Sequence, residues 1–255
     1  MEKIIGAQLY TIREFLTTPE QYAESLQKVK DIGYTTAQLS GGCAMTADQL
    51  AEISKNTGLE LSATHRPYAE FKENLDGLIE FHHKIGAPIA GIGSMQRDIY
   101  GESKDGYLRF AEEFSVIADK LAQNGLTFSY HNHAFEFKKF DGKYGMDYLL
   151  ENSSPNFKFT FDVYWLSVGG VDPERYLRKH ASRIGALHYK DLIIEESKTQ
   201  TMAEIMEGNL DWDGIIKTAD DLAVKYIYVE QDVCKTNPFD CLTTSYNNLK
   251  TKGYK

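Results

Sequence analysis

The strongest constraint on this 255-residue chain is a regular alternation between short apolar segments and stretches with helical spacing. One such stretch places Tyr22, Leu26, Val29 and Ile32 on a single helix face. The apolar segments indicate strands and recur roughly every 25–40 residues, the length of one strand–helix unit. They lie at Ile4–Leu9, Thr35–Leu39, Leu59–Ala63, Ile89–Ile92, Leu126–Tyr130, Lys158–Phe161, Ile184–Tyr189 and Tyr226–Val229. The alternation predicts an α/β protein in which helices connect parallel strands.

Two architectures contain eight parallel strands with helices between them, a closed barrel and an open, doubly wound sheet. A dinucleotide-binding open sheet carries a GxGxxG turn after its first strand, and the fragment Gly91-Ile92-Gly93 is too short to match it. We therefore predict a (β/α)8 TIM barrel formed by one domain over residues 1–255. Two stretches fit less well. Asp172–Lys179 is short for a helix, and Leu192–Leu210 is long and polar, as expected of a lid or a mobile loop.

Composition narrows the classes of partner. The chain has 28 Lys and Arg against 37 Asp and Glu, and the resulting net charge of −9 would repel a nucleic-acid backbone. No run of about 18 uncharged apolar residues is present to span a membrane, and the N-terminus lacks the apolar core of a secretory signal. The three cysteines, Cys43, Cys234 and Cys241, form no CxxC pair. These features predict a cytoplasmic protein with neither a nucleic-acid partner nor a membrane span, and they leave a homo-oligomer open.

Side chains able to bind metals gather at the predicted carboxyl ends of strands, where the active sites of (β/α)8 barrels lie. Four of them stand on separate strands: His131, Asp162, His188 and Glu230. Two imidazoles and two carboxylates converging on one divalent ion would suit Mn²⁺, Co²⁺, Zn²⁺ or Fe²⁺ better than Mg²⁺. This prediction depends on the repetition at strand ends rather than on any one spacing.

Each of these positions also has a structural interpretation. Asp162 could cap a helix or a turn, and Trp165 is as typical of a core as of a ligand platform. Glu136 could be a solvated loop charge, and Asp191 could orient a neighbour or lie on the surface. Glu230 is the least ordinary, because it follows an apolar strand, and a partly buried carboxylate needs a partner or a cation.

Several segments together resemble a known family: Gly6–Arg13, Tyr130–Phe137, Phe161-Asp162, Gly170–Pro173, His188–Asp191, Gly208–Trp212 and Val229–Asp232. They resemble the sugar phosphate isomerase/epimerase family of the xylose-isomerase-like TIM-barrel superfamily, which also contains endonuclease IV-type enzymes, ketose 3-epimerases and inosose dehydratases. The resemblance covers nearly the whole chain. It is specific for the superfamily but does not specify a substrate.

The resemblance implies a divalent cation held by Glu, Asp, His and Glu from strands five to eight. The matching positions are His131, Asp162, His188 and Glu230. His131 departs from the pattern, because epimerases carry there a Glu that is both ligand and base. Trp165 departs as well, where many relatives have a His. The lost carboxylate argues against a symmetrical two-Glu epimerase mechanism, whereas metal binding stays plausible because imidazole is also a ligand.

The resemblance and the strand-end residues together lead us to expect a metal-dependent isomerase or epimerase of carbohydrate metabolism. It would act on a small sugar, keto-sugar or polyol by removing a proton next to a carbonyl. The expected catalytic residues are Glu230, His131 and Lys190, with Glu230 the first candidate for the base. The expected substrate-binding residues are His65, His133, Trp165 and Tyr10.

Three alternatives stay open at this point. The same proton abstraction, followed by expulsion of a β-hydroxyl or glycosyl group, would make the protein a lyase or dehydratase acting on a keto-sugar or keto-glycoside. A decayed site would leave a non-catalytic sugar-binding protein. A metal-dependent endonuclease would share the fold, but the acidic charge argues against a DNA-binding surface.

Overall fold

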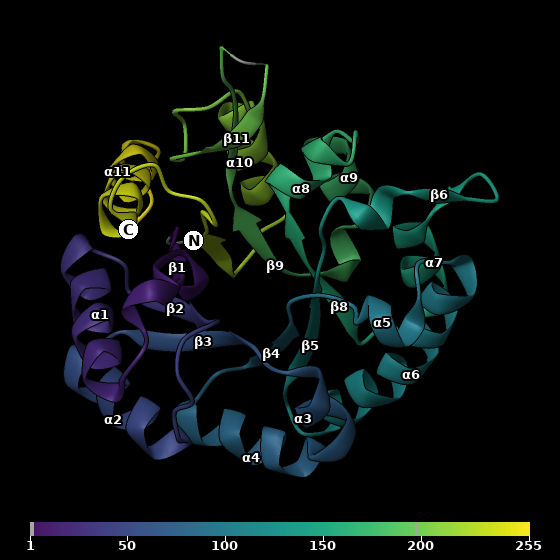
Figure 1. Ribbon diagram of the computed structural model, residues 1–255, viewed down its shortest axis with the longest axis horizontal. Coiled ribbons are helices and arrows are strands. Elements are labelled where there is room, and N and C mark those ends of the chain that lie inside the picture. Colours follow the sequence, from purple (N-terminus) through teal and green to yellow (C-terminus); the bar gives the residue numbers. More distant parts are fainter. Residues whose placement is uncertain (1–2, 197) are drawn as a thin grey trace.

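The computed structural model describes residues 3–196 and 198–255, which form a closed barrel of eight parallel strands (Figure 1). Around the barrel the order is β1, β12, β9, β8, β5, β4, β3 and β2, and β1 pairs with both β12 and β2 to close the ring. The strands are β1 (Gly6–Gln8), β2 (Thr36–Leu39), β3 (Glu60–His65), β4 (Ile89–Ile92), β5 (Thr127–His131), β8 (Phe157–Asp162), β9 (Ile184–Tyr189) and β12 (Ile227–Val229). Each overlaps its predicted segment, so the (β/α)8 barrel is confirmed.

Helices cover the outside of the barrel (Figure 1). They are α1 (Pro19–Ile32), α2 (Ala47–Thr57), α3 (Tyr68–Glu73), α4 (Leu75–Ile85), α5 (Arg97–Tyr100), α6 (Lys104–Gln123), α7 (Gly145–Asn152), α8 (Val163–Val168), α9 (Pro173–Lys179), α10 (Trp212–Asp221) and α11 (Pro238–Thr251), with 3₁₀ turns η1 (Leu9–Phe15), η2 (Phe135–Phe137) and η3 (Ala181–Arg183). Thr18 caps α1 ahead of Pro19, and Thr46 and Gln49 form a capping box on α2. In the part of the chain that is described, no helix is both long and apolar enough to cross a membrane.

Aromatic rings fill the space between α6 and the strands β5 and β8. Phe110 and Phe114 stack on each other at 4.2 Å on the buried face of α6. Phe128 of β5 lies 5.4 Å from the Phe114 ring and 4.8 Å from the Phe157 ring of β8. Because close ring packing of this kind tolerates little displacement, Phe128 and Phe157 hold the two strands in a fixed relation near their amino ends.

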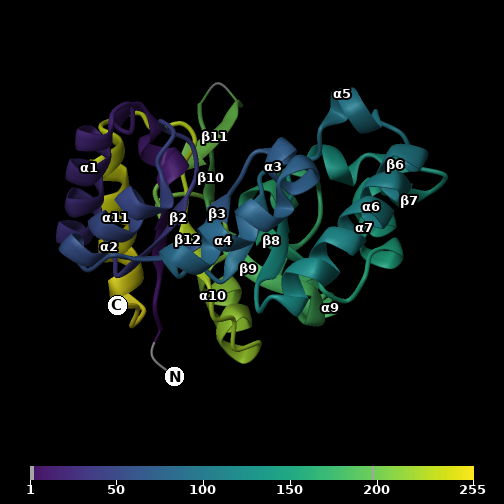
Figure 2. The ribbon, with the colours of Figure 1, turned by 90° about the horizontal axis from the view of Figure 1, so that it is seen from below.

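The connection after β8 consists of two short helices, α8 and α9, which explains why this unit has a weak helical signal in the sequence. The polar stretch after β9 differs from the expected lid or mobile loop. It forms an antiparallel ribbon of β10 (Asp191–Ile194) and β11 (Gln200–Ala203), with Ser197 outside the described residues. A second small ribbon, β6 (Lys139–Phe140) with β7 (Lys143–Tyr144), follows β5. The β10–β11 ribbon projects beyond one end of the barrel, opposite the N-terminal end (Figure 2).

Asp191 anchors the base of the β10–β11 ribbon. Its carboxylate accepts hydrogen bonds from the backbone N–H groups of Leu192 (2.7 Å), Met206 (2.9 Å) and Gly208 (3.0 Å). It also accepts one from the indole N–H of Trp212 at 2.6 Å. Of the two roles open for Asp191, the structure supports the orienting one, because the side chain is fully buried and ties the returning chain to the end of β9.

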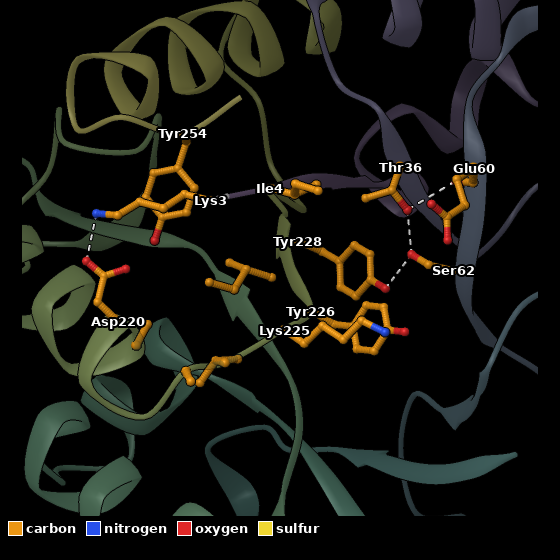
Figure 3. A pocket seen from close by; sticks show the side chains of 14 residues that line it. Lys3, Ile4, Thr36, Glu60, Ser62, Asp220, Lys225, Tyr226, Tyr228 and Tyr254 are labelled. Atoms are coloured by element: carbon orange, nitrogen blue, oxygen red, sulfur yellow. Dashed lines mark hydrogen bonds and ion pairs between the residues drawn. The ribbon is translucent and has the colours of Figure 1, made fainter. Parts of the chain in front are cut away.

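The amino ends of β2, β3 and β12 line a cavity of about 740 Å³ at the base of the barrel (Figure 3). In it, Tyr228 OH lies 2.7 Å from Ser62 Oγ, which in turn bonds Thr36 Oγ1. Thr36 donates to the backbone oxygen of Glu60 at 3.1 Å. With that donor used, the chain runs in one direction from Tyr228 to Glu60, so all three hydroxyl groups donate to a protein acceptor.

Candidate metal centre

Four neighbouring strands, β5, β8, β9 and β12, bring His131, Asp162, His188 and Glu230 together at the other end of the barrel. One donor atom from each lies within 4.8 Å of the others, and all four residues are buried. We call this group the tetrad. It could hold a metal ion, and it contains the four residues predicted as ligands from the sequence. Their actual binding of a metal stays a prediction.

Both imidazoles of the tetrad turn an N–H outward. His188 donates from Nε2 to Gln38 Oε1 at 2.6 Å, and His131 donates from Nδ1 to the backbone oxygen of Gly93 at 3.1 Å. In a neutral ring the other nitrogen then carries a lone pair, which here faces the carboxylates. An outer hydrogen bond of this kind is what orients histidine ligands in metal sites.

The two carboxylates are oriented in the same way. Glu230 accepts a hydrogen bond on Oε1 from Gln8 Nε2 at 2.9 Å, which leaves Oε2 facing the imidazoles. Asp162 accepts on Oδ1 from the backbone N–H of Trp165 at 3.0 Å, so it caps α8 as the structural interpretation expected. Its second oxygen, Oδ2, lies 3.3 Å from Nε2 of His131. Capping and ligand geometry therefore use different oxygens of one side chain.

The atoms of the tetrad that face one another show whether a cation would fit between them. His188 Nδ1 and Glu230 Oε2 are 2.8 Å apart, yet neither atom makes a hydrogen bond of acceptable geometry with any described residue. Both are buried, and two lone pairs this close repel unless a proton or a cation lies between them. The donor set of two nitrogens and two oxygens therefore fits a divalent transition ion.

Lys190 adds a positive charge to this group. Its ammonium lies 2.8 Å from Glu230 Oε2, 3.1 Å from Asp162 Oδ2 and 3.1 Å from Asp232 Oδ2, and its side chain is 1% exposed. With both imidazoles neutral, the carboxylates of Asp162, Glu230 and the partly exposed Asp232 exceed this ammonium by two negative charges. One divalent cation would offset that excess.

The protonation of the tetrad follows from burial and from these charges. Burial raises the pKa of Glu230, but Lys190 and His188 lower it more, so its pKa falls well below the ordinary value. Burial also raises the pKa of Asp162, but Lys190 and then His131 outweigh it, so this pKa is lowered as well. Burial lowers the pKa of His131, yet Asp162 and Glu230 outweigh it and the net shift is upward. Both carboxylates are thus ionised at neutral pH.

Three of the four predicted substrate-binding residues adjoin the tetrad. The rings of His65 and His133 lie 5.3 and 4.7 Å from a tetrad imidazole, and Trp165 lies 5.3 Å from the His133 ring. Each has a buried polar atom, His65 Nε2, His133 Nδ1 or Trp165 Nε1, that makes no hydrogen bond within residues 3–196 and 198–255. Tyr10 instead packs against the guanidinium of Arg13 at 4.3 Å and is 39% exposed.

Glu136 is not the solvated loop charge that the sequence allowed. It is fully buried beneath the loop after β5. Its carboxylate accepts hydrogen bonds from Tyr130 OH at 2.7 Å and from the backbone N–H of His133 at 2.8 Å. Burial raises its pKa to about 7 despite these bonds. Glu136 therefore holds the loop that carries His133.

Sequence reasoning assigned no role to three side chains of the site, Gln8, Gln38 and Asp232. Gln8 and Gln38 are fully buried amides that hold tetrad members. The available signal was an amide within each apolar strand segment, where a buried polar group needs a specific partner. Asp232, two residues after Glu230, pairs with Lys190.

A family model, xylose isomerase-like TIM barrel, matches residues 26–236, well over half of the chain. The chain belongs to this family. Among curated relatives, the inosose dehydratase of Clostridium beijerinckii is 25% identical over 219 residues, which cover 74% of this chain and 73% of the relative. The inosose dehydratase of Geobacillus thermodenitrificans is 24% identical over 207 residues, 69% of each chain. The family resemblance expected from the strand-end motifs is confirmed.

Solved structures share the fold. A sugar phosphate isomerase/epimerase from Parabacteroides distasonis superposes with a TM-score of 0.79 at 24% identity, covering 98% of this chain and 94% of the other. A structure of L-ribulose 3-epimerase gives 0.74 at 14% identity, with the same coverage. At these identities the likeness concerns the barrel, and the chemistry has to be argued from the site.

Proposed function

We propose that this protein is a metal-dependent enzyme that removes a proton next to the carbonyl of a small keto-sugar or keto-polyol. The observation that carries the proposal is the tetrad, in which two buried imidazoles and two buried carboxylates each bring one donor atom within 4.8 Å of the others, and His188 Nδ1 makes no hydrogen bond with a described residue. A site of this kind is costly to fold without a ligand. A non-catalytic sugar-binding protein with a decayed site would not need four metal-binding side chains in this arrangement.

The tetrad residues would hold the cation, which on binding supplies positive charge to a substrate carbonyl and so acidifies the adjacent C–H. Glu230 is the proposed base. Gln8 fixes its Oε1 at 2.9 Å, and a carboxylate oxygen that accepts one hydrogen bond keeps a second lone pair for a proton. The lowered pKa of Glu230 keeps the base ionised at neutral pH.

Lys190 has a different role in the proposal. Its ammonium is buried beside the tetrad, and its pKa is raised because the surrounding carboxylates outweigh the effect of burial. It therefore stays charged. A fixed ammonium of this kind would place positive charge beside a substrate oxygen that gains negative charge as the proton leaves.

The mouth of the barrel fits a polyhydroxylated ligand. His65, His133 and Trp165 each present an unpaired polar atom, as far as the described residues go, next to the tetrad. Hydroxyl groups both donate and accept, so one sugar ring can satisfy all three atoms. The Trp165 face, with Lys190 Nζ 5.5 Å from its ring centroid, offers an apolar surface for the C–H side of the ring.

Two outcomes follow from the same proton abstraction. Epimerisation returns a proton to carbon, and the symmetrical mechanism uses a second carboxylate where this chain has His131. The curated relatives are named inosose dehydratases. Both points favour elimination of a β-hydroxyl group, as in a lyase, over the isomerase that we expected first from the sequence. That the enzyme works in the cytoplasm and without a nucleic-acid partner stays a prediction from composition.

The test uses protein reconstituted with Mn²⁺ or Co²⁺, incubated in D₂O with an inosose and, separately, with a ketohexose. Proton NMR should show loss of the C–H signal next to the carbonyl. Elimination adds a new unsaturated or diketone product, whereas isomerisation adds deuterium without loss of water. Glu230→Gln should cut turnover roughly 10²–10⁴-fold. Exchange that continues undiminished in this variant would move the base to another residue.

A further inference from the structure

Lys190 touches the same oxygen atoms that would bind the metal. Its ammonium lies 2.8 Å from Glu230 Oε2 and 3.1 Å from Asp162 Oδ2, and these are the oxygens that face the imidazoles. Outside the tetrad, it pairs with Asp232 at 3.1 Å. The ammonium is thus part of the inner surface of the candidate metal centre.

Two cations on shared oxygens compete. A divalent ion at an ordinary coordination distance of about 2.1 Å from Glu230 Oε2 would lie no more than about 5 Å from the Lys190 ammonium. At that separation, in a buried place, the charges repel strongly. The ammonium also neutralises part of the negative charge that attracts the metal. Both effects lower the affinity of the tetrad for a divalent ion.

We propose that Lys190 is a built-in counter-cation that weakens metal binding and keeps the metal-free site folded. The inference rests on the proposed metal dependence of the enzyme. Its consequence is an exchangeable ion, in contrast to a permanently bound structural one. Asp232 has the opposite effect, because its carboxylate lies 3.1 Å from the ammonium and offsets part of its charge.

The experiment measures the dissociation constants of Mn²⁺ and Zn²⁺ for metal-free protein by isothermal titration calorimetry. Lys190→Met removes the charge and keeps an unbranched side chain only one atom shorter, and it should tighten binding at least ~10-fold. Lys190→Arg keeps the charge and should stay within about threefold of wild type. Asp232→Asn should weaken binding several-fold. Lys158→Met, which removes a lysine that bonds Ser182 O at the amino end of β8, is the matched control.

Thermal unfolding supplies a second readout. Without metal, the Lys190→Met variant should have a lower melting temperature than wild type, because the carboxylates of Asp162, Glu230 and Asp232 then repel each other with no ammonium between them. With saturating Mn²⁺, its melting temperature should rise more than that of wild type, since tighter binding stabilises the folded state more. If the Met variant does not fold without metal, Lys190→Gln is titrated in its place.

The outcomes separate the two proposals. Wild type that binds no divalent ion overturns both the metal-dependent function and this inference. Wild type that binds metal, with Lys190→Met equal or weaker, overturns the inference and leaves the proposed function standing. Opposite shifts for Lys190→Met and Asp232→Asn support it, because a general loosening of the site would weaken both variants.

Discussion

Both ends of this barrel bury polar side chains, and the two groups are built differently. At the amino end, Tyr228, Ser62 and Thr36 form a directed chain of hydroxyl groups, each donating to a protein acceptor (Figure 3). At the carboxyl end, His188 Nδ1 makes no hydrogen bond with a described residue and lies 2.8 Å from Glu230 Oε2, an oxygen that pairs with the Lys190 ammonium. The base carries a cavity but is internally satisfied, whereas the mouth carries unsatisfied atoms and excess charge.

The difference teaches which cluster to assign to ligand binding. Cavity volume alone points to the base, with its space of about 740 Å³. The hydrogen-bond partners point to the mouth instead, because a buried polar atom without a protein partner usually bonds a water, an ion or a ligand. The lining of the base cavity includes the ion pair Lys3–Asp220 at 2.7 Å, which is also internally balanced. We therefore expect substitutions at the two ends to have separable effects.

The largest expected effect is on metal content. Asp162→Asn keeps the size of the side chain and removes one charged donor, so the affinity for Mn²⁺ should fall at least ~100-fold. Elemental analysis of the dialysed protein measures the metal content directly. Ser62→Ala at the base is the control and should keep the metal content of wild type. Equal metal in the Asp162 variant would remove this residue from the ligand set.

The next effect concerns how the free energy of unfolding depends on pH through Glu136, which is buried beneath the loop after β5. The pKa of Glu136 is raised from 4.5 to about 7 by burial, so the folded state retains a proton between these values that the unfolded state loses. The stability from this group is complete below about pH 4.5 and is lost as the pH rises through 7. Glu136→Gln cannot ionise. Relative to wild type, its unfolding free energy should therefore gain roughly 1–3 kcal/mol between pH 5 and pH 8.

Urea unfolding at both pH values measures the Glu136 effect. The linkage argument concerns the change with pH, and the loss of the hydrogen bond to the His133 N–H affects both pH values alike. A constant difference between variant and wild type across this range would mean that Glu136 is ionised in the folded protein throughout.

At the base, Tyr228→Phe removes the first donor of the hydroxyl chain. Ser62 Oγ loses its donor, and we expect a cost of about 1 kcal/mol in unfolding free energy. Metal affinity and turnover should not change, because the site lies at the opposite end. Denaturant unfolding and calorimetry on the same sample check both statements. A loss of metal affinity would show that the two ends are coupled through β12.

The smallest expected effect is on substrate affinity. Trp165→Phe keeps an aromatic face and removes the unpaired indole N–H, so KM should rise about fivefold with a smaller change in kcat. Steady-state kinetics on the active substrate separate the two constants. Loss of metal from this variant would instead assign Trp165 to the support of Asp162, whose carboxylate accepts a hydrogen bond from the Trp165 backbone N–H.

Much of the fold was predictable because its signals are local. Alternation of apolar segments located all eight strands. The tetrad followed from topology, since the carboxyl ends of parallel strands meet at one end of a barrel. His131, from β5, and Glu230, after β12, lie far apart in sequence, and only the closed ring makes them neighbours.

The remainder depends on contacts that no local pattern contains. Gln8 and Gln38 orient tetrad members through single hydrogen bonds, and an amide inside a strand does not reveal its partner. The role of Lys190 became clear only from the distances between its ammonium and the carboxylates of Asp162, Glu230 and Asp232, which are distant in the sequence. The β10–β11 ribbon was missed because its polar residues hide the alternation that marks a strand.

The carboxylate of Asp191 has a consequence for how this family can diversify. It accepts hydrogen bonds from Met206 and Gly208, which follow β11, and from Trp212 of α10, so the chain leaves β9 and returns at one buried, hydrogen-bonded point. Whatever is inserted beyond that point transmits little displacement to His188 and Lys190. The outer ribbon therefore acts as an exchangeable module. We expect loops of other lengths and compositions to be grafted there, changing which molecules reach the barrel mouth while the tetrad keeps its shape.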